Sequence, residues 1–206
     1  WDIYFARLKK YGVDRAFFWY LGHPKSGNAV QESIGKDKFL EALQGLDARV
    51  KDGRYPAFFS VTVDEAIRSG NAMAAIRDLA AAIKGEKPLA LKIQGGTLDS
   101  ISKYDPTLID YIACNGNYAG NRDWCKANNK LLNIYSSTST RVSPASMRLV
   151  FGFQPWQYDA FAVNGWALNW SNGSAFNDLD AGMSDWQTIL PNWCGRPIST
   201  PTWESL

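Results

Sequence analysis

The sequence predicts an α/β protein in which parallel strands alternate with helices. Short apolar runs recur along the chain, and helix-like segments separate several of them. The runs are continuously apolar instead of alternating with polar residues, as is typical of parallel strands buried on both faces. We count seven candidate strands, near residues 16, 57, 89, 108, 131, 161 and 186.

This order of elements favours a (β/α)8 barrel of the TIM type that is incomplete at its N-terminal end. Complete barrels of this kind typically have about 250 residues, and this chain has 206. A chain that starts inside the first helix and lacks the first strand fits that length. We therefore expect residues 1–206 to form a single partial βα-barrel domain of a longer parent chain. A doubly wound open sheet is the alternative.

Each element has its own local signal. Helical spacing of apolar residues marks the segments 1–11, 39–50 and 72–83, one segment through Trp124 and Cys125, and one from Pro144 through Trp156. Gly12 and Gly53 are placed to end the first two helices. Ser143 before Pro144 is a good helix start, because proline is favoured at the first helical position. The apolar strands are 16–21, 58–63, 89–93, 108–114, 131–135, 161–168 and 186–190.

Two adjacent carboxylates, Asp64 and Glu65, stand where the apolar strand 58–63 ends. They could simply begin the following helix, but Ser69, Gly70 and Asn71 are closer capping residues. Ligands of strand–helix proteins gather at the carboxyl ends of the strands. Asp64 and Glu65 are therefore the candidate catalytic residues, with a solvated turn as the alternative.

Other candidates follow other strands. His23 comes after the first strand, either to position a sugar or as a loop histidine without a role. Asn115, Asn169 and Asp178 lie on predicted loops of the same face and could bond sugar hydroxyls. Gly95-Gly96 could approach a phosphate, but the fuller glycine pattern is absent and a plain turn is favoured. Aromatic residues either pack in the core or offer flat faces to a sugar ring, and the candidates are Tyr135, Trp166 and Trp170.

Composition narrows the classes of partner. The formal charge is +2 and no basic cluster stands out, which argues against nucleic-acid binding. No run of about 18 apolar residues occurs, so no membrane insertion is expected. Cys114, Cys125 and Cys194 lack metal-binding spacing and only one histidine is present, so we predict no metal site and no cofactor.

Several motifs, in their order along the chain, resemble glycoside hydrolase family 123 and the related domain-of-unknown-function group 4091. Asp64-Glu65 resembles the family's Asp-Glu-Pro strand end, although Ala66 replaces the proline. The segment 109–112 is similar to the family's Val-Asp-Val-Trp strand and 131–135 to its Trp-Trp-Tyr strand. Two further resemblances lie in 148–170 and in the tail 195–204. Leu190-Pro191-Asn192 departs from the family's Tyr-Pro-Gly.

The resemblance implies a retaining β-N-acetylhexosaminidase, similar to N-acetylgalactosaminidases, in a secreted, periplasmic or cell-surface setting. In this family the 2-acetamido group of the sugar acts as the nucleophile. Asp64 would stabilise the charged intermediate and Glu65 would be the acid/base. A carbohydrate is then the expected partner. The alternatives are a glycosidase for another sugar, and a non-catalytic carbohydrate-binding or structural barrel of a surface or viral assembly.

Overall fold

The computed structural model describes residues 2–12, 16–22, 28–63, 70–97, 105–136 and 143–165, and the backbone at 169–170, 186–187, 189–190 and 198–199. Its contacts divide the chain into two compact units. The first unit comprises Trp1–Ala113 and Trp124–Lys130, and the second comprises Cys114–Asp123 and Leu131–Leu206. The prediction of a single domain stays a prediction.

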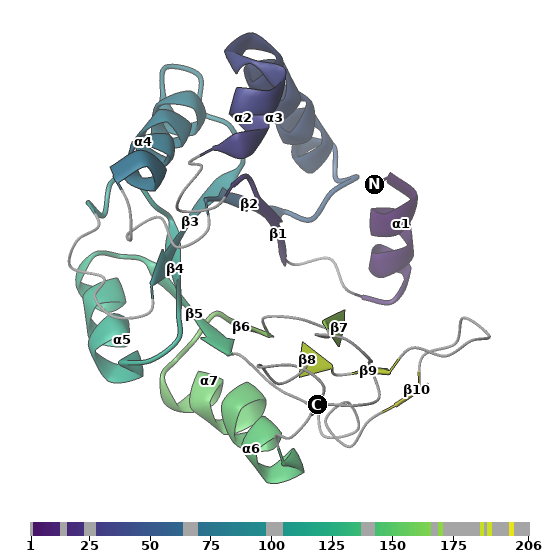
Figure 1. Ribbon diagram of the computed structural model, residues 1–206, viewed down its shortest axis with the longest axis vertical. Helices are drawn as coiled ribbons and strands as arrows, with labels where there is room; N and C mark the ends of the chain where they lie inside the picture. Colours follow the sequence, from purple (N-terminus) through teal and green to yellow (C-terminus); the bar gives the residue numbers. More distant parts are fainter. Residues whose placement is uncertain are drawn as a thin grey trace. The chain divides into compact units, whose positions relative to one another are not determined.

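The first unit is a sheet with helices along it (Figure 1). Its strands are neighbours in the order β1 (Ala16–Tyr20), β2 (Phe58–Thr62), β3 (Lys92–Thr97) and β4 (Tyr111–Cys114). β1 pairs with β2 in parallel, with Ala16 opposite Phe58, and β2 pairs with β3 in parallel, with Ser60 opposite Lys92. The helices are α1 (Asp2–Lys10), α2 (Ala29–Ile34), α3 (Lys36–Lys51) and α4 (Gly70–Lys84).

The two faces of β2 differ in chemistry, and both are buried. Phe59, Val61 and Val63 point to one face, and the ring of Phe59 lies 6.1 Å from that of Phe5 in α1. Ser60 and Thr62 point to the other face, as the two-residue period of a strand requires. The first face belongs to an apolar core that also includes Phe39 and Leu43 of α3 and Ile76, Leu79 and Ile83 of α4. Burying each such side chain contributes roughly 1.5–3 kcal/mol.

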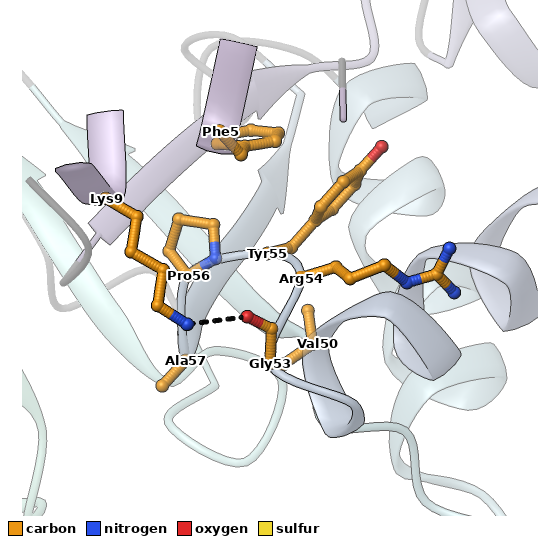
Figure 2. Close-up of a pocket in the computed structure, with 8 residues that line it drawn as sticks. All are labelled: Phe5, Lys9, Val50, Gly53, Arg54, Tyr55, Pro56 and Ala57. Atoms are coloured by element: carbon orange, nitrogen blue, oxygen red, sulfur yellow. Dashed lines mark hydrogen bonds between the residues drawn. The ribbon is translucent and has the colours of Figure 1, made fainter. Parts of the chain in front are cut away.

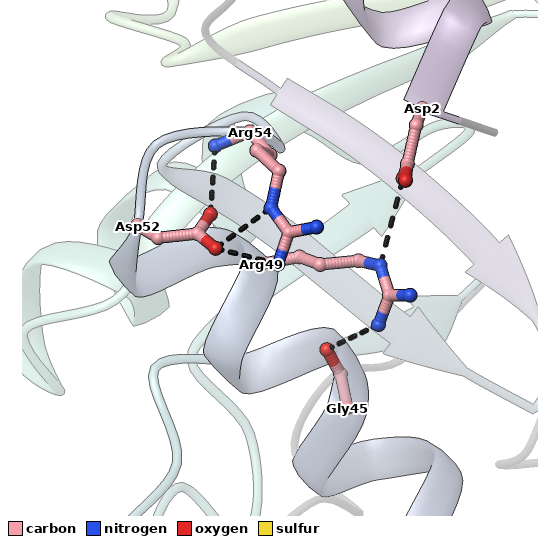
Figure 3. A network of polar contacts seen from close by, with 5 residues as sticks. All are labelled: Asp2, Gly45, Arg49, Asp52 and Arg54. Carbon is pink, nitrogen blue, oxygen red and sulfur yellow. Dashed lines mark hydrogen bonds and ion pairs between the residues drawn. The ribbon is translucent and has the colours of Figure 1, made fainter.

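Polar contacts join the end of α3 to α1 and to the turn that follows α3 (Figure 3). Arg49 Nε lies 3.5 Å from Asp2 Oδ1, and Arg49 Nη1 donates to the backbone oxygen of Gly45 at 3.0 Å. Arg54 donates to Asp52 through both its backbone N–H and its guanidinium, which holds the pKa of the Asp52 carboxyl below its ordinary value. These groups are at the surface, where each ion pair contributes about 0–1 kcal/mol.

The second unit contains the parallel pair β5 (Leu131–Ser136) and β6 (Ala162–Gly165). The helical segment between them starts with α6 (Pro144–Arg148), continues through a π-helical turn (Leu149–Phe153) and ends with α7 (Gln154–Gln157). Ser143 caps α6, accepting a hydrogen bond from the Ser146 N–H, so the predicted helix start is confirmed. The unit boundary falls within β4 and within α5 (Tyr118–Ala127).

The short strands of the second unit pair antiparallel. β7 (Asn169–Trp170) pairs with β8 (Trp186–Gln187), and β9 (Ile189–Leu190) pairs with β10 (Ile198–Ser199). Parallel strands need a crossover of about a dozen residues or more. The chain leaves far fewer residues than that between β6 and β7 and between β8 and β9, so neither connection can form a strand–helix repeat.

The expectation of a TIM-type (β/α)8 barrel is therefore wrong. The structure is α/β with parallel pairing, but within the described residues it forms no closed eight-stranded barrel. The predicted strand at 186–190 is in fact two short antiparallel strands, β8 and β9. The sequence shows one apolar run at 186–190, but a single residue separates β8 from β9, so no helix can stand between these two strands.

Three local differences from the sequence prediction have simple reasons. β3 starts at Lys92 and includes Gly95 and Gly96, so these glycines are not a turn and not a phosphate loop. β4 starts at Tyr111, after a turn at residues 106–108. α2 was not predicted, because a helix of six residues is too short to show helical spacing. Asn28 caps this helix by accepting a hydrogen bond from the Gln31 N–H.

Candidate functional site

A buried polar network lies on the second face of β2, below the end of this strand. Ser60, Thr62, Gln94 and Tyr111 are each at most 4% exposed. The hydroxyls of Ser60 and Tyr111 are 2.7 Å apart, and the Tyr111 hydroxyl donates to Gln94 Oε1 at 2.8 Å. Thr62 Oγ1 donates to the backbone oxygen of Gln94, also at 2.8 Å. The network thus joins β2, β3 and β4 through side chains as well as through the sheet.

The four side chains of this network are neutral, and the hydroxyls of Ser60 and Tyr111 are hydrogen-bonded to each other. The Tyr111 proton goes to Gln94, so the Ser60 hydroxyl is the donor of the Ser60–Tyr111 bond. In a low-dielectric interior such bonds are strong and fix the positions of the groups that make them. These four side chains therefore offer a rigid support for the segment that follows β2, and none of the four is a carboxylate, a histidine or a cysteine.

The segment that follows β2 carries the candidate catalytic pair. Val63 is the last residue described there and is fully buried. Asp64 and Glu65 come next in the sequence and lie outside the described residues, as do His23, Trp166 and Asp178. These five assignments stay predictions.

The structure places the remaining site candidates in the second unit. Asn115 is half-buried in the turn between β4 and α5, and Tyr135 is half-buried in β5. Asn169 and Trp170 form β7, of which only the backbone is described. All four belong to the same unit, and Asn169 lies in a short strand and not on the predicted loop. Their role in binding a sugar stays a prediction.

Sequence reasoning missed two asparagines on the β5–β6 pair. Asn133 is fully buried, and its Nδ2 donates to Asn164 Oδ1 at 2.6 Å. An asparagine inside an apolar strand was the signal that could have identified Asn133, because buried amides need partners. Asn164 was hidden within a run that looked uniformly apolar.

Surface pockets of the described residues lie at the end of the sheet where β2 and β3 begin. One has a volume of about 160 Å³ and is lined by α1 and the segment before β2. Figure 2 shows Lys9 reaching from α1 to the backbone oxygen of Gly53, a hydrogen bond of 3.1 Å. The other, of about 500 Å³, lies between α3, α4 and the segment before β3. Neither pocket is lined by the polar network or by a predicted site residue.

The described part of the chain holds no group of three or more His, Cys, Asp or Glu side chains arranged for a metal ion. Burial raises the pKa of the Cys114 thiol to about 11, which makes this thiol a poor nucleophile near neutral pH. Cys125 is buried as well. Neither thiol therefore has the solvent exposure of a catalytic cysteine.

Comparison with known proteins gave no match, either to a family model or to a curated protein. Within the described residues, no helix has the length and apolar character needed to span a bilayer.

Proposed function

We propose that this protein is a glycoside hydrolase, a retaining β-N-acetylhexosaminidase that relies on the 2-acetamido group of its substrate. The observation that carries the proposal is the pair Asp64-Glu65, which directly follows a buried strand of a parallel sheet. In such sheets the carboxyl ends of the strands are the usual place for ligands. The ordered motifs that resemble glycoside hydrolase family 123 support the same activity, and with it a secreted, periplasmic or cell-surface location.

An adjacent pair of carboxylates suits this mechanism better than ordinary glycoside hydrolysis. Ordinary retaining enzymes hold two carboxyls about 5 Å apart across the scissile bond, with one acting as nucleophile. In the assisted reaction the acetamido carbonyl oxygen attacks the anomeric carbon while the bond to the leaving oxygen breaks. Glu65 gives its proton to the leaving oxygen, and Asp64 holds the acetamido N–H and balances the positive oxazolinium.

The second half of the reaction restores the enzyme. Water attacks the anomeric carbon and gives its proton to Glu65, while the bond to the acetamido oxygen breaks. The anomeric configuration is thus retained after two inversions. Successive strand residues point to opposite faces, so both carboxylates can act on one sugar only where the strand has ended. The end of β2 at Thr62, two positions before Asp64, supports the proposal in this respect.

The buried network of Ser60, Thr62, Gln94 and Tyr111 supports the proposal in one further respect. A catalytic group must be held close to its working geometry, which requires a rigid base. Residues 60 and 62 of β2 are fixed to β3 and β4 by bonds of 2.7–2.8 Å. The proposal does not depend on a closed barrel.

The test is a panel of nitrophenyl glycosides assayed with the 206-residue chain and with any longer parent chain. We expect turnover of the N-acetylhexosaminides and none of the matching sugars that lack the acetamido group. Turnover of non-acetamido sugars alone would exclude assisted catalysis and favour a glycosidase for another sugar. Glycan binding without turnover of any glycoside would favour a carbohydrate-binding or structural module.

A further inference from the structure

The surface pocket between α1 and residues 53–57 has the size of one aromatic ring (Figure 2). Its volume is about 160 Å³. An apolar protein cavity of about 150 Å³ can hold a benzene molecule, whereas sites for drug-sized ligands usually measure about 300–1,000 Å³. This pocket therefore has room for a single six-membered ring with a small substituent.

The walls of the pocket are mostly apolar. Phe5 of α1 and Tyr55 supply two aromatic rings whose centroids are 4.5 Å apart, and Val50 and Pro56 add aliphatic surface. Aromatic rings attract one another in offset-stacked and edge-to-face arrangements, with a gain beyond the area that they bury. The walls therefore favour an aromatic ligand over a small hydrated ion.

The charges at the pocket are positive. None of its eight lining residues is acidic, and two of them, Lys9 and Arg54, are cations. Arg54 is already paired with Asp52, through contacts of 2.6 and 2.7 Å. Lys9 is exposed, and among the described residues its ammonium group has one acceptor, the Gly53 backbone oxygen at 3.1 Å. An ammonium group has three donors, so Lys9 retains two donors for a negatively charged ligand.

The rest of α1 strengthens this preference for an anion. Arg7 and Lys10 add positive charge to the helix, and its one acid, Asp2, lies 3.5 Å from Arg49 Nε. A surface with an excess of one charge attracts ligands of the opposite sign. The size, the walls and the charge of the pocket thus describe one kind of ligand.

We propose that this pocket binds a small aromatic carboxylate, with its ring against Phe5 and Tyr55 and its carboxylate bonded to Lys9 Nζ. The ring accounts for the volume and for the aromatic walls, and the carboxylate takes the two remaining donors of Lys9. The pocket residues 53–57 precede β2 in the chain, whereas the candidate catalytic pair follows this strand. The inference therefore does not depend on the proposed activity.

The first experiment compares three probes on the wild-type 206-residue chain. Benzoate carries both the ring and the charge, benzamide carries the ring alone, and inorganic phosphate carries the charge alone. The backbone ¹H–¹⁵N signals of Gly53 and Ala57 are followed by NMR up to about 10 mM, tenfold above the millimolar Kd expected for so small a ligand. We expect saturable shifts with benzoate, about two- to fivefold weaker binding of benzamide, and no shifts with phosphate.

Three outcomes of this titration would overturn the proposal. Unchanged Gly53 and Ala57 signals with benzoate would show that the pocket does not bind the ligand. Benzamide binding as tightly as benzoate would show that the charge of Lys9 has no part in recognition. Phosphate binding as tightly as benzoate would show the same of the ring.

The second experiment changes the lysine. Lys9→Met keeps the apolar part of the side chain and removes the ammonium group, so the Kd for benzoate should rise about two- to fivefold, the effect of one exposed ion pair. The Kd for benzamide should stay as in the wild type. Lys9→Arg keeps the charge and should bind benzoate as the wild type does.

Lys10→Met is the matched control, because Lys10 is the neighbouring exposed lysine of α1 and does not line the pocket. It should leave both Kd values unchanged. If Lys9 served only to hold α1 to Gly53, Lys9→Met would lower the Tm and leave the Kd for benzoate unchanged. That result, or an equal rise of the Kd for benzoate and benzamide, would overturn the proposal.

Discussion

The carboxylate of Asp47 accepts a hydrogen bond of 2.6 Å from the backbone N–H of Ala90. Asp47 lies in α3 and is 8% exposed, whereas Ala90 lies just before β3. The second carboxylate oxygen accepts from Lys51 Nζ at 2.7 Å. One helix side chain therefore fixes the chain at the entry to a central strand, and the ion pair with Lys51 is the more exposed of its two contacts.

The two contacts of Asp47 predict different costs for two substitutions. Asp47→Ala removes both contacts and leaves the Ala90 N–H without its acceptor, which should lower the free energy of unfolding by about 2–3 kcal/mol. Asp47→Asn keeps an oxygen for Ala90 and loses only the ion pair, which should cost less than about 1 kcal/mol. Urea unfolding measures both, with Glu41→Gln on the exposed face of α3 as a control. Equal losses in the two variants would contradict this account.

The hydroxyl of Tyr111 predicts a cost of a different kind. Tyr111→Phe removes the donor that Tyr111 provides to Gln94 Oε1 and the acceptor that it provides to Ser60 Oγ, inside a buried network. The free energy of unfolding should fall by about 1–3 kcal/mol. Tyr11→Phe, at a tyrosine that is 77% exposed, should change it by less than about 0.5 kcal/mol. The network would not hold the strands together if the two variants were equally stable.

Much of the fold could be predicted because its signals are local. The segments 39–50 and 72–83 have helical apolar spacing, and both are helices in the structure, as α3 and α4. β2 has apolar residues on one face and small buried hydroxyls on the other, so its sequence predicts one continuous buried strand. Barrel closure depends instead on pairing between distant strands, for which no local signal exists, and there the prediction was wrong.

The candidate site could be predicted only in part. The acid pair at Asp64-Glu65 was visible because charge stands out directly after an apolar run. Asn133, Asn164 and the Gln94–Tyr111 bond were not visible, because polar side chains within strands acquire meaning only through the register that pairs them. Tyr135 was selected for its position at a strand end, and the structure adds Asn164 as its neighbour in register.

The contact between Arg54 and Asp52 predicts a pH effect. The side-chain and backbone hydrogen bonds from Arg54 lower the pKa of the Asp52 carboxyl in the folded state. A carboxyl with a lowered folded-state pKa contributes stability above its unfolded pKa, and this contribution is lost as the pH falls through the folded pKa. Arg54→Gln should therefore raise the pKa of Asp52 toward its ordinary value, as measured by carboxyl ¹³C NMR titration. Arg122→Gln is the control, because Arg122 forms its ion pair with Asp123. This variant should leave the pKa of Asp52 unchanged.

The burial of Cys114 predicts a thiol that is inert in the folded protein. Its pKa of about 11 leaves the thiolate scarce at pH 8, and the side chain is fully buried. Iodoacetamide should label Cys114 at pH 8 only after urea unfolding, as read from peptide masses. Cys125, which is 2% exposed, should behave in the same way. Labelling of Cys114 in the native protein at the rate of a small free thiol would show that this strand opens.

The two candidate catalytic carboxylates predict different kinetic defects. Glu65 is assigned the proton transfer, and general acid catalysis typically contributes about a hundred- to ten-thousandfold to the rate. Its loss should matter most for a poor leaving group, which needs the proton, and least for an activated aryl oxide. Asp64 is assigned the stabilisation of the charged oxazolinium, a task that does not depend on the basicity of the leaving group.

Glu65→Gln should therefore retain much more activity on nitrophenyl N-acetylhexosaminides than on natural glycans, whereas Asp64→Asn should lower both activities alike. The measurement is kcat/KM on the two substrate classes for each variant. Glu86→Gln is the control, because it removes an exposed carboxylate that is not a candidate site residue. If both variants kept kcat/KM within a few-fold of the wild type, Asp64 and Glu65 would be ordinary turn residues. The reacting groups would then have to be sought at the carboxyl ends of the other strands, where ligands of parallel sheets usually bind.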